Sequence, residues 1–343
     1  MDTVILDAFD EKQDREAIAA AAQVIRRGGL CAFPTETVYG LGADALNVDA
    51  VRKIFEAKGR PQDNPLIVHV SCLEEIPPLV EKFDSRAVAL AKQFWPGPLT
   101  MILPRSERVP ACVSAGLKTV AIRLPSNPIA RALIRVSGRP IAAPSANLSG
   151  RPSPTTAQHV IADLSGRVDM ILRSAPCTVG LESTVVSLIE EKPRLLRPGF
   201  ITAEQLSAVC GPVEMDRAVF HSVAGDAVVH APGMKYKHYA PHATVKIVKG
   251  DFDAYCRFVT EHAALGVVAM CFDGEGKSLP IPFVEYGHEA SPSEQAQQLF
   301  DVLHRVDELG AEVVYARCPS CKGVGLAVAN RLFKAAGFEV IEL

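Results

Sequence analysis

The fold of this chain is decided by residues 31–70, CAFPTETVYGLGADALNVDAVRKIFEAKGRPQDNPLIVHV. The apolar run at each end, CAF and LIVHV, is short and typical of a buried strand. The polar run PTETVYGLGA at 34–43 indicates a glycine-punctuated loop, and KGRPQDNPL at 58–66 indicates a second, basic loop. The stretch therefore predicts, in order, a strand, a polar loop, a helix, a basic loop and a strand.

The helix between the two loops is predicted by the spacing of its apolar residues. Val51, Ile54 and Phe55 lie three and four positions apart, on one face of a helix. We expect Asp49 to cap its start and Gly59 to stop it.

Both loops carry side chains suited to an anionic ligand with polar handles, and we expect the cations of the second loop to lie in solvent. The polar residues are Thr35, Glu36, Thr37 and Tyr39 in the first loop, Lys58, Arg60 and Asn64 in the second, and His69 in the strand that follows.

The composition is that of a globular protein with two domains. With 343 residues and 48% hydrophobic content, the chain can bury a substantial core. Its formal net charge of −3 and pI near 6.3 argue against a surface for duplex nucleic acid. Nine cysteines at irregular spacing fit reduced thiols better than a disulfide framework. No signal peptide or membrane-spanning stretch is expected, so we expect a cytoplasmic protein.

The chain is expected to divide into a first domain over residues 1–212, a linker over 213–243 and a second domain over 244–343. In the second domain, strand-like runs such as VKIVKG and GVVAMCFD alternate with helices, which predicts a small parallel α/β domain of Rossmann-like type. No GxGxxG follows its first strand, so dinucleotide binding is not expected there. The linker run KYKHY carries more aromatic and basic side chains than a passive tether needs, so we expect it to pack on another part of the molecule.

Two more motifs carry candidate ligand contacts. Arg123 lies in the strand-like run VAIRL between apolar neighbours, which favours a side chain that faces a ligand. APSANLSG presents Ser145 and Asn147 in a turn, and Ile141–Ala143 before it is expected to be too short for a full strand. The turn is either a connector or a cradle of hydroxyl and backbone N–H groups for a phosphate.

Other local patterns are interpreted as structural. Ser291 with Glu294 predicts a capping box. The CxxC at 318–321 lacks a second ligand pair at zinc-finger spacing, and we interpret it as two structural thiols. Neither a Ser/His/Asp arrangement nor a GxxxxGK[ST] phosphate loop is evident.

Taken together and in order, PTETVYGLGADA, KGRPQDNPLIVHV, VAIRLP, APSANLSG, LESTVV and LRPG closely resemble the YrdC-like threonylcarbamoyl-AMP synthase family. This resemblance covers roughly residues 14–206. The linker APGMKYKHYAP and the later run GVGLAVANRL resemble the long form of the family, so that nearly the whole chain is covered.

The resemblance implies both a fold and a reaction. The fold is a twisted, mixed, largely antiparallel YrdC-like α/β sheet, joined to a smaller Rossmann-like parallel α/β domain. The reaction joins L-threonine, bicarbonate and ATP into L-threonylcarbamoyladenylate and releases pyrophosphate. Mg²⁺ is expected to enter through the ATP phosphates, without a protein side-chain ligand. The product would pass to the tRNA threonylcarbamoyl transferase machinery, with no stable nucleic-acid binding by the chain itself.

The resemblance also implies site residues, and the chemistry needs positioning and positive charge rather than a protein nucleophile. Lys58 and Arg60 match the catalytic cations of the family. Tyr239, in the linker, matches a residue that closes over the nucleotide. The ATP side is matched by Arg60, Asn64, Thr119, Ala143, Ser145, Asn147, Ser153, Arg197 and Tyr239, and the threonine side by Thr37, His69, Arg123 and Ser183.

Two other classes of function remain open at this point. An RNA-binding module would use the concave surface of a YrdC-like fold, but the acidic balance and the lack of interleaved aromatic and basic residues count against it. A carbamoyl transferase of the hydrogenase-maturation type would carry an acylphosphatase domain and zinc-finger cysteine pairs, which this sequence does not show.

Overall fold

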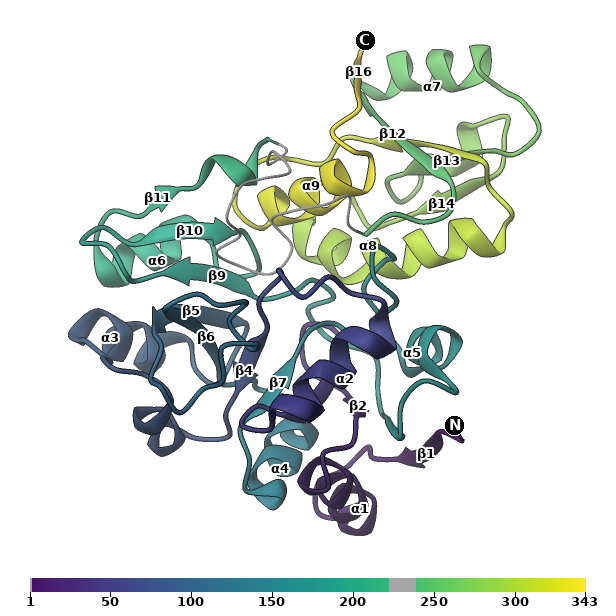
Figure 1. Ribbon diagram of the computed structural model, residues 1–343. Helices are drawn as coiled ribbons and strands as arrows, with labels where there is room; N and C mark the ends of the chain where they lie inside the picture. Colours follow the sequence, from purple (N-terminus) through teal and green to yellow (C-terminus); the bar gives the residue numbers. More distant parts are fainter. Residues whose placement is uncertain (1, 222–238) are drawn as a thin grey trace.

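An eleven-stranded mixed sheet carries the first part of the chain, and a five-stranded parallel sheet carries the second. The computed structural model describes residues 2–221 and 239–343. Figure 1 shows the smaller sheet set above the larger one, with α8 and α9 on the side that faces the first domain and α7 on the other side. Within the described ranges, no helix has both the length and the apolar character needed to cross a membrane.

The elements of the first domain alternate around its sheet. Its strands are β1 (Val4–Asp7), β2 (Cys31–Phe33), β3 (Gly40–Asp44), β4 (Ile67–His69), β5 (Leu99–Pro104), β6 (Thr119–Arg123), β7 (Ile141–Ala143), β8 (Met170–Arg173), β9 (Thr184–Ser187), β10 (Arg194–Arg197) and β11 (Glu214–Met215). Its helices are α1 (Arg15–Arg26), α2 (Val48–Lys58), α3 (Ser85–Phe94), α4 (Pro128–Ser137), α5 (Ala157–Leu164) and α6 (Ala203–Cys210).

The strand order of this sheet is β1-β8-β2-β3-β7-β4-β6-β5-β9-β10-β11. The expected mixed sheet is confirmed. Among the described strands, however, parallel pairs (β1–β8, β8–β2, β4–β6, β5–β9, β10–β11) are as frequent as antiparallel ones, so the sheet is not largely antiparallel. Strand β11 lies inside the range expected to be linker, and residues 222–238 of that range lie outside the described residues.

The second domain is the expected parallel α/β unit, with strand order β14-β13-β15-β12-β16 and every described pair parallel. Its elements are β12 (Thr244–Lys249), α7 (Phe252–Glu261), β13 (Val267–Cys271), β14 (Phe283–Glu285), α8 (Pro292–Glu308), β15 (Val313–Arg317), α9 (Val324–Ala335) and β16 (Val340–Glu342).

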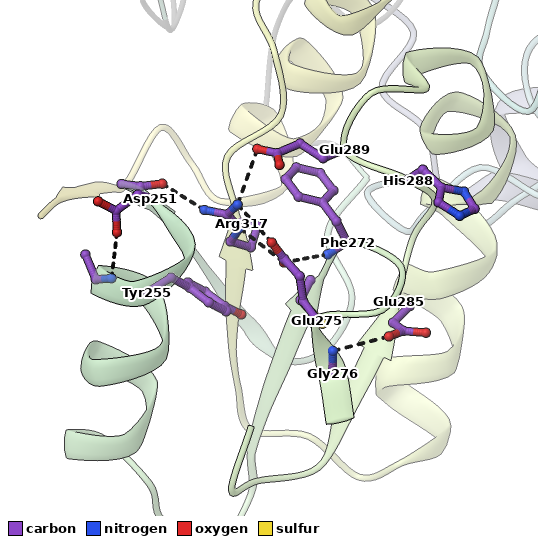
Figure 2. Close-up of polar contacts among 12 residues, drawn as sticks. Asp251, Tyr255, Phe272, Glu275, Gly276, Glu285, His288, Glu289 and Arg317 are labelled. Carbon is purple, nitrogen blue, oxygen red and sulfur yellow. Dashed lines mark hydrogen bonds and ion pairs between the residues drawn. The ribbon is translucent and has the colours of Figure 1, made fainter. Parts of the chain in front are cut away.

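Arg317 fills the carboxyl edge of this second sheet, the edge at which ligands bind in many open α/β folds. Its guanidinium is buried, with Nη2 2.9 Å from a Glu275 oxygen and 3.3 Å from Glu289, and Nη1 2.8 Å from the Gly250 carbonyl. Figure 2 shows Arg317 between the two carboxylates with the ring of Phe272 beside it. Each guanidinium nitrogen is thus bonded to the chain's own oxygens, which makes the cluster a structural one.

Two elements of the first domain differ from expectation. The segment Ile141–Ala143 is a full member of the sheet, β7, paired with both β3 and β4. The glycine-rich end of the first loop is strand β3, in which Gly40 and Gly42 lie opposite Phe33 and Cys31 of β2.

Two helix caps also differ from expectation. The start of α2 is capped by Asn47, whose side-chain oxygen accepts from the N–H groups of Asp49 and Ala50, so Asp49 is not the cap. Ser291 makes no capping hydrogen bond at α8, and the carboxylate of Glu294 is bonded to His288 at 2.6 Å, so the predicted capping box is absent. The predicted stop at Gly59 is confirmed, with φ of 60°.

One hydrophobic core is shared by the two domains. Val38 and Leu181 of the first domain belong to the same buried cluster as Phe300 of α8 and Val328 of α9, and Tyr239 joins it. The domains are therefore packed against each other through apolar surface, not merely tethered.

Candidate active site

The central strands β4 and β6 place two groups of predicted residues at opposite edges of the sheet. Strands β4 and β6 are parallel, and His69 pairs with Arg123 where both strands end. The same strands begin at the opposite edge of the sheet, next to the loop of residues 59–66 and at Thr119. A ligand lying along β4 would therefore meet the basic loop at one end and the His69–Arg123 pair at the other.

Lys58 links the basic loop to the turn after β7. Its Nζ donates to the Ser145 carbonyl at 2.6 Å and to the Asn147 carbonyl, and the Ser145 hydroxyl donates to the Asn147 side-chain oxygen. The expectation that Lys58 lies in solvent is wrong: it is the last residue of α2, only 2% exposed, and the turn packs over it. Burial and the nearby Arg60 lower its pKa well below the ordinary value.

Arg60 and Asn64 have polar atoms without partners. Arg60 is half-buried, and its Nη2 lies 3.4 Å from the carbonyls of Asn64 and Pro65. Its Nε and both side-chain polar atoms of Asn64 are buried and find no hydrogen-bond partner among the described residues. Burial lowers the pKa of Arg60 to about 10, which leaves it charged near neutral pH. Unpaired buried polar groups cost free energy, so they point to a ligand.

At the other end, Arg123 forms an ion pair with Glu36. The Arg123 Nη2 atom lies 2.8 Å from a Glu36 carboxylate oxygen, and both side chains are buried. The second oxygen of Glu36 and the Nε of Arg123 have no hydrogen-bond partner among the described residues. His69 is held neutral beside them, because burial and Arg123 lower its pKa to about 3. Thr37 is fully buried, with its hydroxyl 2.9 Å from that of Thr35.

Ser183 connects the Arg123 end to Arg197. Its hydroxyl lies 2.7 Å from that of Thr100, which is the residue opposite Arg123 in the β5–β6 pair. Arg197 donates to the Ser183 carbonyl at 3.0 Å and to its hydroxyl at 3.2 Å. Arg197, expected on the nucleotide side, thus directly contacts a residue expected on the threonine side.

Tyr239 closes the cavity from the side of the second domain. Its ring is 5% exposed and packs on Phe300 with ring centroids 5.3 Å apart. Its backbone has φ of +67°, which is rare for a residue with a side chain, and the next N–H, of Ala240, donates to the Gly150 carbonyl. The rest of the KYKHY run lies outside the described residues.

One cavity gathers most of the predicted residues. Its lining includes ten of them, namely Thr37, Lys58, Arg60, His69, Arg123, Ala143, Ser145, Asn147, Arg197 and Tyr239. Four others lie just outside the lining: Asn64, Thr119, Ser153 and Ser183. Ser153 is fully buried, and its hydroxyl donates to a carboxylate oxygen of Glu182.

Sequence analysis missed two charged residues at or behind this cavity, Glu182 and Arg331, and it did not predict the pairing of Glu36 with Arg123. Glu182 lines the cavity and pairs with Arg331 of α9. Burial raises the pKa of Glu182, but Arg331 and Arg197 outweigh this effect and hold the pKa below its ordinary value. The motifs PTETV and LEST contain the two acids, but their partners lie far along the chain and no local signal points to them.

Comparison with known proteins identifies the family. The family model described as telomere recombination, for Sua5, YciO and YrdC, matches residues 23–199. The model described as the C-terminal domain of threonylcarbamoyl-AMP synthase matches residues 201–337. The threonylcarbamoyl-AMP synthase of Pyrococcus abyssi is 45% identical over 349 residues, covering 99% of this chain and all of that protein.

The chain belongs to the threonylcarbamoyl-AMP synthase family. The family member from Bacillus subtilis is 46% identical over 341 residues, covering 98% of each chain. The crystal structure of P. abyssi Sua5 complexed with L-threonine superimposes with a TM-score of 0.91 at 42% identity and covers both chains fully. The long form of the family, with a YrdC-like domain and a Sua5 C-terminal domain, is thereby confirmed for this chain.

Proposed function

We propose that this chain is an L-threonylcarbamoyladenylate synthase. The amine of L-threonine adds to bicarbonate with loss of water, and an oxygen of the resulting carbamate attacks the α-phosphate of ATP, from which pyrophosphate leaves. The product serves the threonylcarbamoyl modification of the adenosine beside the anticodon in tRNA, through a separate transferase machinery. The observation that carries the proposal is full-length similarity to family members, supported by one cavity with a basic loop at one end and the Arg123–Glu36 ion pair at the other.

The Arg123 end is proposed to hold threonine. Arg123 offers a fork of N–H donors to the threonine carboxylate, and Glu36 offers an oxygen that has no hydrogen-bond partner to its ammonium group. The ion pair between the two places these groups side by side, as the two charged groups of an amino acid require. Thr37 and Ser183 supply hydroxyls, and the neutral His69 adds a ring nitrogen without adding charge.

The opposite end is proposed to hold the carbamate and the phosphates. Arg60 directs positive charge to the developing and leaving oxyanions, and Lys58 adds its charge while fixing the turn of Ser145 and Asn147. Asn64, Thr119, Ala143 and Ser153 are proposed for the nucleotide, together with Arg197. Tyr239 covers the site and excludes water from the reactive product.

Mg²⁺ is proposed to arrive as the ATP complex. Of the described residues that line the cavity, Glu182 is the one carboxylate, and its two oxygens are already bonded to Ser153 and Arg331. The other acid near the cavity, Glu36, is paired with Arg123 and is proposed for the threonine ammonium, so the ATP phosphates themselves would hold the ion. When bound there, Mg²⁺ offsets phosphate charge.

The test is turnover of ATP to AMP-containing product and pyrophosphate by the full chain. We expect pyrophosphate release with Mg²⁺–ATP to require both L-threonine and bicarbonate, and a product with the mass of threonylcarbamoyl-AMP. Pyrophosphate release without threonine, or RNA binding with no turnover, would overturn the proposal.

A further inference from the structure

Helix α9 buries three large polar side chains against the first domain. Asn330, Arg331 and Lys334 are 1%, 0% and 5% exposed. Positions 330, 331 and 334 share one face of a helix, which in an ordinary domain interface would be apolar. Burying the guanidinium of Arg331 costs free energy unless oxygens of the first domain offset that cost.

The guanidinium of Arg331 is fully engaged with the first domain. Its Nε lies 2.8 Å from a Glu182 carboxylate oxygen, its Nη1 donates to the Pro198 carbonyl at 2.7 Å, and its Nη2 reaches the Glu182 carbonyl at 3.3 Å. Arg331 is fully buried and lies outside the lining of the cavity, so it does not contact a substrate there. It acts through the groups that it holds.

Those groups adjoin two proposed site residues. Glu182 precedes Ser183, and Pro198 follows Arg197, whose guanidinium contacts both the carbonyl and the hydroxyl of Ser183. One side chain of the second domain therefore fixes the start of β9 relative to the end of β10. The carboxylate of Glu182 extends the same link to the hydroxyl of Ser153.

We propose that Arg331 is a positioning residue, through which the second domain sets the geometry of the threonine end of the site. This inference rests on the proposed function. A guanidinium is suited to the role because its planar fork can reach a carboxylate and two carbonyls at once, whereas an ammonium group is a point charge. The second domain is then a structural part of the active site and more than an anchor for the linker.

The test uses the full chain and two variants that keep the buried charges balanced. Arg331→Lys keeps the positive charge opposite Glu182 but cannot also reach the Pro198 carbonyl. Arg331→Met combined with Glu182→Gln removes both charges, so that no unpaired carboxylate is left buried. The matched control is Asp301→Asn, which removes another contact across the domain interface, to His159 at 3.5 Å, outside the cavity lining.

We expect both Arg331 variants to melt as folded proteins and to bind L-threonine roughly 10- to 100-fold more weakly by calorimetry, a loss typical of small misplacements in a site. KM for threonine should rise more than KM for ATP, and the control should change neither. A folded variant that binds threonine like the unaltered chain would overturn the inference. Threonine binding by the unaltered chain without adenylate formation would refute the proposed function instead, and the calorimetric comparison would still decide the role of Arg331.

Discussion

At the scale of single residues, Lys58 and Arg60 hold their charges in different ways although they lie two positions apart. The Nζ of Lys58 donates hydrogen bonds to the carbonyls of Ser145 and Asn147, and the side chain is almost fully buried. Arg60 is half-buried, keeps an unpartnered Nε and stays charged near neutral pH. Lys58 is therefore both a support and a charge, whereas Arg60 is available to a substrate oxyanion.

This difference predicts different effects of removing each side chain. Arg60→Ala should lower adenylate formation by about 100-fold or more with little change in melting temperature, since about 3 kcal/mol is the usual worth of one preorganised oxyanion donor. Arg60→Lys should also lose activity, because a point charge does not replace a fork. Lys58→Ala should lose activity and in addition about 1–3 kcal/mol of stability for the carbonyls left unsatisfied.

The test compares each variant with the unaltered chain in two measurements, the initial rate of pyrophosphate release and the melting temperature. Near-normal turnover of Arg60→Ala at saturating substrates would contradict the assignment of Arg60. A Lys58→Ala variant that melts with the unaltered chain would contradict the supporting role of Lys58.

The amino-acid end of the cavity predicts an order of substrates. Serine lacks one methyl group, and an apolar contact to that group is worth only about 1–3 kcal/mol, so serine should react poorly but detectably. Valine lacks the hydroxyl, so it would lose the hydrogen bond proposed between that hydroxyl and the polar groups at this end, and it should be rejected more strongly. Competing rates with the three amino acids give the order. Valine that reacts as well as serine would exclude a polar group that recognises the hydroxyl.

At the scale of elements, local sequence predicted most helices and strands and failed where neighbours decide. Strand β7 has only three residues, two of them alanine, and it is a strand because β3 and β4 bond it on both sides. Strand β3 carries glycines, which are depleted in strands. A Cβ on Gly42 would lie 2.7 Å from the Phe33 ring, so glycine is required by the ring packed on it. Such requirements come from residues distant in sequence.

The contact between a first-domain loop and α8 depends in the same way on one glycine, Gly180. It has φ of +79°, and a Cβ there would lie 2.4 Å from the Cα of Gln297. Gly180→Ala should therefore push the loop that carries Glu182 away from the second domain. The control is Gly116→Ala, where φ is +82° and nothing lies within 4 Å, so that only the backbone strain is shared.

We expect Gly116→Ala to lower the free energy of unfolding by about 1 kcal/mol, because alanine is strained in the left-handed backbone conformation. Gly180→Ala should cost a further 1–3 kcal/mol or so for overpacking and should also weaken threonine binding. Chemical denaturation and threonine calorimetry measure the two effects. Equal losses of stability in the two variants would mean that the loop and α8 do not meet closely.

At the scale of the whole molecule, the two domains meet through a buried interface with its own charges. His159 of α5 stacks on His304 of α8 with ring centroids 3.9 Å apart, and Asp301 lies 3.5 Å from His159. Sequence motifs predicted most of the residues that the structure gathers around one cavity, but they did not predict this interface, because Glu182 and Arg331 belong to different domains. A motif records neighbours along the chain, whereas their pairing exists only after the domains pack.

The stacked histidines predict loss of stability in acid. Burial, His159 and Arg151 lower the pKa of His304 to about 3, and burial lowers that of His159. Between pH 6.5 and about 3 the imidazole of His304 is protonated in the unfolded chain but stays neutral in the folded chain. The free energy of unfolding therefore falls as pH decreases through this window. For His304 the slope is about 1.4 kcal/mol per pH unit within this window.

Urea denaturation at pH 7, 6 and 5 tests this prediction. His304→Phe keeps a ring for stacking and should flatten the pH dependence by about 1 kcal/mol per unit below pH 6. His262→Ala, a change at an exposed histidine away from the interface, should leave the slope as it is. An unchanged slope in His304→Phe would contradict the assignment.

The pairing of Glu182 with Arg331 also bears on how the protein is made. At roughly 5–20 residues per second, a ribosome needs on the order of ten seconds to translate the 149 positions between them. Throughout that interval Glu182 of the emerging first domain lacks its hydrogen-bonded partner Arg331, and of the two arginines that lower its pKa only Arg197 has been synthesised to offset its charge. Until α9 is synthesised, the surface around Glu182 therefore stays uncovered and accessible to chaperones and proteases. The packing of α9 then buries this carboxylate against Arg331.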